Sequence, residues 1–179
     1  MMRDLRPAVF LAACLLAAGT ASAQTAKSAP LAKELTALLD QKKLDSLGTK
    51  TADGRFVAAL YFPGTQLLVV SAKYSAPALL EQTLSQKAYR EAYQELQGAG
   101  VRDSKVFITD LGADGLRPKP GDGQGSDTYV TSDTARTTFD GDPKKQKLTD
   151  EEYQKRFDAA DDSYSSMLQA LTLAARGPS

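Results

Sequence analysis

The sequence predicts an α+β fold: an antiparallel sheet or split barrel of about six strands, with an N-terminal helix, a middle helix or helix pair and a long C-terminal helix. Three observations support this prediction. Leucines recur at helical spacing soon after an N-terminal leader, short apolar runs separated by Asp-Gly and Pro-Gly turns follow, and a long stretch with a three–four apolar spacing closes the chain. Residues 24–179 have the usual length of a single domain.

The first 23 residues have the composition of a secretory signal peptide. Arg3 and Arg6 precede an apolar run from Val9 to Gly19, and Ala21-Ser22-Ala23 supplies the small residues of a cleavage site. The apolar run is shorter than the roughly 20 residues that a membrane-spanning helix needs, and no second run is long enough. We therefore expect cleavage after Ala23 and an exported protein, periplasmic or extracellular.

A second interpretation of the leader involves Cys14. The stretch Leu11-Ala12-Ala13-Cys14 resembles a bacterial lipoprotein cleavage box, in which the cysteine is lipidated and becomes the first residue. However, Leu15 to Ala18 continue the apolar run past the cysteine, where a lipoprotein turns polar. The pattern favours soluble export.

The first helix is expected to be capped by Ser28, with Pro30 in its first turn, and to end before Gly48. Its apolar face consists of Leu31, Leu35, Leu38, Leu39, Leu44 and Leu47.

Strand-like residues follow. A short strand leads into the Ala52-Asp53-Gly54 turn, residues 55–62 form a second strand, and residues 66–71 form a third after Pro63-Gly64. Asp-Gly favours a hairpin because glycine adopts the positive φ of the turn without strain. The unbroken apolar run Leu67 to Val70 indicates a strand that is buried on both faces. These residues predict an antiparallel meander.

The middle of the chain is predicted to contain helix, one strand and a long loop. Residues 77–97 are expected to be helical, and a break near Ser85-Gln86 would split them into two helices. A fourth strand covers 105–109. Residues 111–127 then contain five glycines, two prolines and three aspartates, which predicts a long, mobile surface loop.

The C-terminal third is predicted to form a hairpin and a helix. Strands over 128–131 and 135–139 flank the hairpin turn, and Thr149 to Glu152 form a capping box that begins the last helix. The apolar residues of this helix are Tyr153, Phe157, Ala160, Tyr164, Met167 or Leu168, and Leu171.

The composition restricts the chemistry of the protein. The chain has no His and no Trp, and its single cysteine, Cys14, lies in the leader. No thiolate nucleophile, imidazole base or ordinary zinc, copper or haem ligand therefore remains after cleavage, and we expect no metal site. The 22 basic and 22 acidic residues balance, which argues against nucleic-acid binding. The sequence thus favours a protein without catalytic machinery of its own, unless a bound cofactor supplies the reactivity.

Two charged segments have both a functional and a structural interpretation. Asp140-Gly141-Asp142 and Gly121-Asp122-Gly123 resemble calcium loops, but they lack the full ligand spacing, and we interpret them as turns. Lys144-Lys145-Gln146-Lys147 could meet a phosphate or an acidic partner, and we interpret it as a solvated loop.

Further candidates lie on the predicted helices. Asp158, Asp161 and Asp162 could divide acid and base roles, and we interpret them as a solvated acidic face of the last helix. Tyrosine suits the edge of a core, a pocket wall or a dimer surface. The tyrosines in question are Tyr74, Tyr89, Tyr93, Tyr129, Tyr153 and Tyr164.

The stretch from Leu47 to Ala72 resembles the opening of the flavin-binding split-barrel group, the pyridoxamine-phosphate-oxidase-like proteins. It consists of a short strand, a turn, two apolar strands and then Ser71-Ala72-Lys73 before a helix. The resemblance implies an FMN cofactor, whose phosphate would lie near Ser71, Lys73 and Ser75. The chain departs from that group because it shows no clear phosphate-binding arginine pattern.

The leading hypothesis is therefore an exported domain that binds a small molecule or a protein without catalysing a reaction. One alternative is a flavin-dependent oxidoreductase of the split-barrel type. Another is a structural or assembly protein that forms a homodimer through its tyrosine-bearing helices. The sequence names no ligand, substrate or partner.

Overall fold

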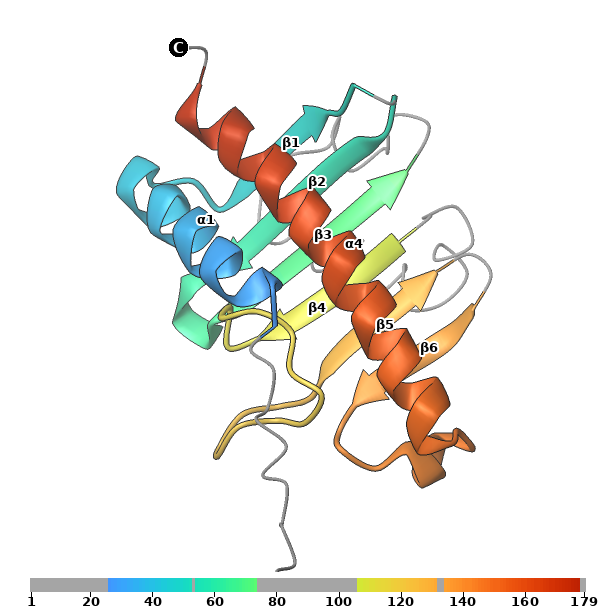
Figure 1. Ribbon diagram of the computed structural model, residues 1–179. Helices are drawn as coiled ribbons and strands as arrows, with labels where there is room; N and C mark the ends of the chain where they lie inside the picture. Colours follow the sequence, from blue (N-terminus) through green and yellow to red (C-terminus); the bar gives the residue numbers. More distant parts are fainter. Residues whose placement is uncertain (1–25, 53, 74–105, 132–133, 178–179) are drawn as a thin grey trace, which may run out of the picture.

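The computed structural model describes residues 26–52, 54–73, 106–131 and 134–177, which form a layer of two helices on a six-stranded sheet (Figure 1). The predicted helix or helices over 77–97 lie outside the described residues, as do the leader and Ser75. The elements are α1 (Ser28–Lys42), β1 (Ser46–Lys50), β2 (Phe56–Phe62), the 3₁₀ turn η1 (Pro63–Thr65), β3 (Leu67–Lys73), β4 (Val106–Leu111), β5 (Asp127–Thr131), β6 (Thr134–Phe139), the 3₁₀ turn η3 (Pro143–Gln146) and α4 (Asp150–Arg176).

The sheet is an open antiparallel meander. Its strand order is β1-β2-β3-β4-β5-β6, so each strand pairs with its neighbours in sequence. This confirms the predicted α+β class and the antiparallel sheet. Because β1 and β6 form two separate edges, the sheet is not closed into a barrel.

Side chains alternate between the two faces of the sheet, as strand geometry requires. In β2, Val57, Ala59 and Tyr61 belong to the core beneath the helices, whereas Leu60 and Phe62 belong to a second cluster on the opposite face. The helix-covered core also includes Leu68 and Val70 of β3, Ile108 of β4, Phe139 of β6 and the apolar residues of α1 and α4.

Strand β3 is buried on both faces. Leu68 and Val70 lie in the core beneath the helices, and Val69 lies in the second cluster with Phe107 of β4. All three β3 residues have no exposed surface. The prediction that this strand is buried on both faces is confirmed.

Helix α1 differs from the prediction at both ends. Lys27 is its N-cap and makes no side-chain cap bond, so the expected cap at Ser28 is wrong. At the other end, Lys43 adopts a left-handed conformation with φ 54°, which ends the helix before Leu47. Leu47 instead pairs with Ala59 in β1. Tertiary contacts, described below, supply the missing cap.

Helix α4 is the element that the sequence predicts best. Both bonds of the capping box are present, since Thr149 Oγ1 accepts from Glu152 N (3.1 Å) and Glu152 Oε2 accepts from Thr149 N (2.7 Å). The helix crosses the sheet from the β6 side to the β1 side and packs against α1 (Figure 1). Its Phe157 packs edge-on against Phe139 of β6, with ring centroids 5.3 Å apart.

Candidate functional site

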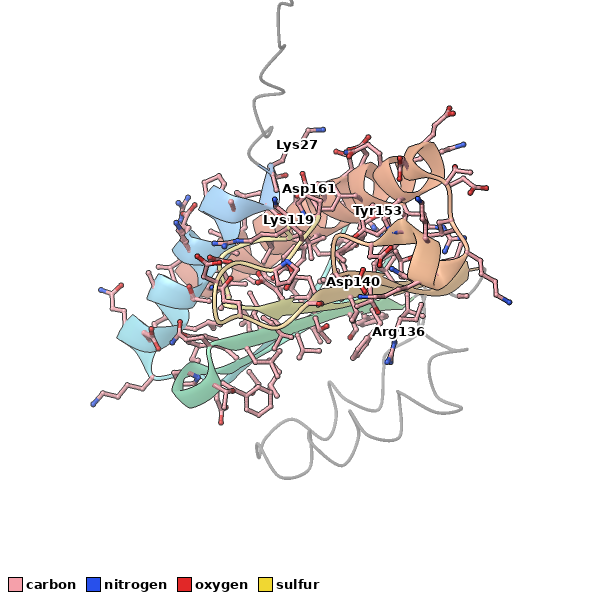
Figure 2. All side chains as sticks on the ribbon, turned by 90° about the horizontal axis from the view of Figure 1, so that it is seen from below. Lys27, Lys119, Arg136, Asp140, Tyr153 and Asp161 are labelled. Carbon is pink, nitrogen blue, oxygen red and sulfur yellow. The ribbon has the colours of Figure 1, made fainter. Side chains whose placement is uncertain are left out.

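An open cleft of about 290 Å³ lies where the loop after β4, the turn after β6 and the first turns of α4 meet. Figure 2 shows Lys119, Asp140 and Tyr153 in this part of the molecule. The lining residues are Pro118, Lys119, Gly141, Pro143, Asp150, Tyr153 and Gln154. Two proline rings and a tyrosine therefore adjoin one cation, one carboxylate and one amide.

The hydroxyl of Tyr153 holds the walls of the cleft together. It donates to the carbonyl of Pro118 (2.6 Å) and accepts from the N–H of Gly141 (3.0 Å). One side chain of α4 is thus bonded to the loop and to the turn at once. Burial raises the pKa of this phenol, so the hydroxyl keeps its proton and continues to donate to Pro118 near neutral pH.

Two buried aspartates hold the loop that forms the first wall. Asp110, in β4, accepts from the N–H groups of Asp114 (3.2 Å) and Gly115 (2.9 Å). Asp127, at the start of β5, accepts from the N–H groups of Leu111 (2.8 Å) and Arg117 (2.9 Å). The two ends of the loop are therefore attached to the strands that it connects.

The environment of these carboxyls opposes their ionisation. Burial raises the pKa of Asp110 to about 6, against which the N–H groups of Gly115 and Asp114 and the Tyr164 hydroxyl favour the charged form. Burial, with the charge of Asp110 as the second cause, raises the pKa of Asp127 to about 8. The protonation of Asp110 and Asp127, to which the loop N–H groups bond, therefore depends on pH in the range near neutrality.

The first half of the loop packs more closely than its composition indicates. Leu116 is 1% exposed, and its N–H donates to the Ser28 hydroxyl (3.0 Å). At Gly115, a Cβ would lie 2.4 Å from the Cα of Ala29, so only glycine fits against α1 there. Exposed positions are concentrated in the second half, over residues 118–125. Mobility of the 111–127 loop stays a prediction for proteolysis to test.

The opposite wall is the turn after β6. The N–H of Asp142 donates to Asp140 Oδ1 (2.9 Å), which is the local bond of an Asx turn. Lys145 Nζ lies 3.8 Å from a carboxylate oxygen of Asp140 and 3.7 Å from one of Asp142. A Cβ on Gly141 would lie 2.9 Å from Lys119 Cβ, so the two walls approach closely here.

The acidic residues of α4 separate into two groups. Asp158 and Asp162 are exposed, as predicted for a solvated face. Asp161 is buried, and the solvated interpretation is wrong for it. Its carboxylate accepts from the N–H groups of Lys27 (2.8 Å) and Ser28 (3.0 Å) and so caps α1 from another helix (Figure 2).

The basic run before α4 is solvated, because Lys144, Lys145 and Lys147 are all exposed. The described tyrosines are not surface residues. Tyr129, Tyr153 and Tyr164 are all buried in the core beneath the helices. Tyr74, Tyr89 and Tyr93 lie outside the described residues.

Only part of the flavin prediction falls on described residues. Ser71 lies in β3, is 1% exposed, and its Oγ has no hydrogen-bond partner within the described ranges. Lys73 is the last residue of β3. The prediction that Ser71, Lys73 and Ser75 approach a flavin phosphate stays a prediction.

Sequence reasoning indicates only part of the cleft. It predicts Tyr153 as part of an apolar helix face and as one of the tyrosines that suit a core edge, a pocket wall or a dimer surface. It places Asp127 in a loop and does not single out Asp110. Asp110 follows an apolar strand, but the N–H groups that it binds converge on it only when the loop folds back. No local sequence pattern indicates that these N–H groups meet at Asp110.

Comparison with known proteins finds no family model, no curated protein and no solved structure that matches this chain. Across the described ranges, no three His, Cys, Asp or Glu side chains gather as metal ligands. Among the described helices, none is both long enough and apolar enough to cross a bilayer.

Proposed function

We propose that this protein is an exported binding domain that catalyses no reaction, and that the cleft beside Tyr153 is its ligand site. The observation that supports the proposal is the Tyr153 hydroxyl, which fixes Pro118 on one wall and Gly141 on the other. A site whose walls are fixed before the ligand arrives loses little conformational entropy on binding.

The lining indicates the class of ligand. The rings of Pro118, Pro143 and Tyr153 offer an apolar surface, while a cation, a carboxylate and an amide come from Lys119, Asp150 and Gln154. The cleft volume of about 290 Å³ lies just below the usual range for small-molecule sites, about 300–1,000 Å³. This combination suits a short peptide segment that inserts one apolar side chain and presents a carboxylate to Lys119.

The buried carboxyls support a binding role over a catalytic one. Asp110 is fully buried, and both Asp110 and Asp127 are bonded to loop N–H groups. Their hydrogen bonds shape the backbone of the loop, so they position one wall of the cleft. A general base would need to reach a substrate proton directly or through one water.

The test uses pools of tetrapeptides that each contain one aromatic residue, added to isotope-labelled protein. We expect amide NMR shifts at Gly141 and Gln154, with larger changes for peptides that have a free carboxylate. Lys119→Glu should weaken binding of those peptides about fivefold or more, because it reverses the charge that faces the carboxylate.

Lys144→Glu is the matched control, since Lys144 is exposed and lies outside the cleft lining. It should leave binding unchanged. If no pool shifts the cleft residues, or if both variants weaken binding equally, the proposed site is wrong. A yellow protein with a flavin absorption band would instead support the flavin-dependent alternative.

A further inference from the structure

The outer edge of the sheet at β1 carries backbone groups that point away from β2. Tyr61 N donates to Asp45 O (2.9 Å), and Thr51 N donates to Arg55 O (2.8 Å). Between Asp45 and Thr51, residues whose N–H and C=O groups bond to β2 alternate with residues whose groups point away from it. Hence Leu47 and Thr49 bond to β2, whereas the N–H and C=O groups of the alternate residues point outward. Those residues are Ser46, Gly48 and Lys50.

These outward groups have no hydrogen-bond partner in the part of the chain that the structure describes. The side chain of Lys50 does not cover the edge, because its Nζ lies over the Phe56 ring at 5.4 Å from the centroid. An unpaired strand edge of this kind is a template for another strand.

The opposite edge is protected. In β6, the N–H of Thr138 donates to Gln146 Oε1 (2.7 Å), and the Thr138 carbonyl accepts from Gln146 Nε2 (2.6 Å). The Gln146 amide therefore occupies the position that a residue of an added strand would take. The edge of β6 is therefore capped at Thr138, whereas no described side chain bonds to the outward groups of β1.

Apolar side chains lie close to the β1 edge. Of the described large apolar residues, Leu44 and Leu173 are the exposed ones, at 39% and 66%. Leu44 precedes β1 by two positions, and Leu173 lies in the C-terminal end of α4, which reaches the β1 side of the sheet (Figure 1). Leu44 therefore leaves apolar surface next to the open edge, whereas Leu173, two residues from each of the buried Leu171 and Ala175, lies on the face of α4 that points away from the sheet.

We propose that a second copy of this chain pairs with β1, antiparallel and about a two-fold axis at Gly48, so that one sheet continues through both copies. In this register Ser46 faces Lys50 of the second copy, and Leu47 faces Thr49. The lysines of the two copies lie about 14 Å apart along the strands. A register centred on Lys50 would place two ammonium groups directly opposite each other, which is unfavourable.

The two-fold axis of such a pairing is perpendicular to the sheet. Both helix layers therefore lie on the same side, and the C-terminal ends of the two α4 helices approach each other above the junction. Self-complementarity of one patch is what a two-fold dimer requires.

Sedimentation equilibrium of the purified protein tests the proposal, and we expect a dimer. Lys50→Pro removes the outward N–H, which β1 does not use to bind β2, and proline is tolerated at sheet edges. Two hydrogen bonds are lost per dimer, so the dissociation constant should rise about tenfold. Lys50→Ala is the matched control, because it removes the same ammonium but keeps the N–H, and it should dimerise normally.

Ser46→Pro provides a second variant, because the outward N–H of Ser46 is likewise not used to bind β2. Ser46 is the first residue of β1, where proline is tolerated, so the fold should be unaffected while dimerisation weakens. A monomer at about 100 μM would overturn the proposal, since an interface of this kind should associate more tightly. A dimer that both Lys50→Pro and Ser46→Pro leave unchanged would also overturn it, because its interface would lie elsewhere.

Discussion

The hydroxyl of Tyr164 donates a 2.9 Å hydrogen bond to Oδ2 of Asp110, and neither side chain has exposed surface. Tyr164 lies in the middle of α4, and Asp110 lies where β4 leads into the loop. The bond thus joins the helix layer, the sheet and the base of the cleft wall. Burial raises the pKa of Tyr164 well above its ordinary value, so the phenol remains the donor.

We expect the free energy of unfolding to fall as the pH rises from about 5 to about 8. The pKa values of Asp110 and Asp127 are raised to about 6 and about 8, from 3.8, so the folded state holds these protons more tightly than the unfolded chain does. The stability that they contribute is complete below the unfolded pKa and is lost as the pH rises through the folded values. The slope from one group is at most about 1.4 kcal/mol per pH unit.

Asp127→Asn should flatten this dependence, because asparagine does not titrate. Denaturant unfolding at several pH values measures the slope. Asp122→Asn is the matched control, since Asp122 is an exposed aspartate of the same loop. Equal slopes in the parent and Asp127→Asn would show that Asp127 titrates normally.

Phe157→Ala should destabilise the fold by about 3–5 kcal/mol, because it leaves a cavity between α4 and the sheet. The ring is 6% exposed and packs against Phe139. Lys155→Ala, at an exposed position two residues earlier, should change stability by less than about 0.5 kcal/mol. Thermal or urea unfolding distinguishes the two, and a loss below about 1 kcal/mol in Phe157→Ala would place the ring outside the core.

Tyr153→Phe should loosen the cleft. It removes the hydroxyl that binds Pro118 and Gly141, at a cost of about 1–3 kcal/mol. Limited proteolysis should then cut the exposed residues 118–125 faster, while residues 111–117 stay protected by Asp110 and Asp127. Tyr129→Phe is a suitable control, since no described residue bonds its hydroxyl. If the loop of the parent resists protease and the variant behaves identically, Tyr153 does not control the loop.

Asp161→Asn should destabilise α1 by about 1–2 kcal/mol, because an amide offers one acceptor where the carboxylate offers two to the N–H groups of Lys27 and Ser28. Asp162→Asn is the matched control: Asp162 is exposed, and its partner among the described residues is the Lys27 ammonium. Hydrogen exchange at the first turn of α1 is the readout. Equal exchange in both variants would contradict a capping role for Asp161.

The exported protein should begin at Gln24. Arg3 and Arg6, the apolar run and Ala21-Ser22-Ala23 predict this cleavage. N-terminal sequencing of the protein recovered outside the cytoplasm is the test. A lipid-modified Cys14 as the first residue would instead identify a membrane-anchored lipoprotein.

The sequence predicts the parts of the fold that short-range patterns determine. The Thr149–Glu152 capping box and the spacing of Phe157 and Tyr164 are local, and α4 matches them. The start of α1 does not follow its local pattern, because its acceptor, Asp161, is 133 positions from Ser28. Local propensity named Ser28 as the cap, but its hydroxyl binds Leu116 instead.

The cleft was not predicted, for the same physical reason. Its main components are polar groups of ordinary residues that meet only after folding: a Tyr153 hydroxyl, a Pro118 carbonyl and a Gly141 amide. Glycine and proline in the loop indicate irregular backbone, and they do so correctly. Composition says nothing about which N–H groups Asp110 and Asp127 bind.

The Asp161 cap also constrains the order in which the protein can mature. A chain that emerges from a ribosome or a membrane channel with its N-terminus first exposes α1 long before residue 161 appears. Until then the first N–H groups of α1 lack their acceptor, and the helix lacks the α4 surface on which it packs. The first helix in the sequence is therefore among the last elements to become stably folded. Nearly the whole chain must be present before either end of the domain is complete.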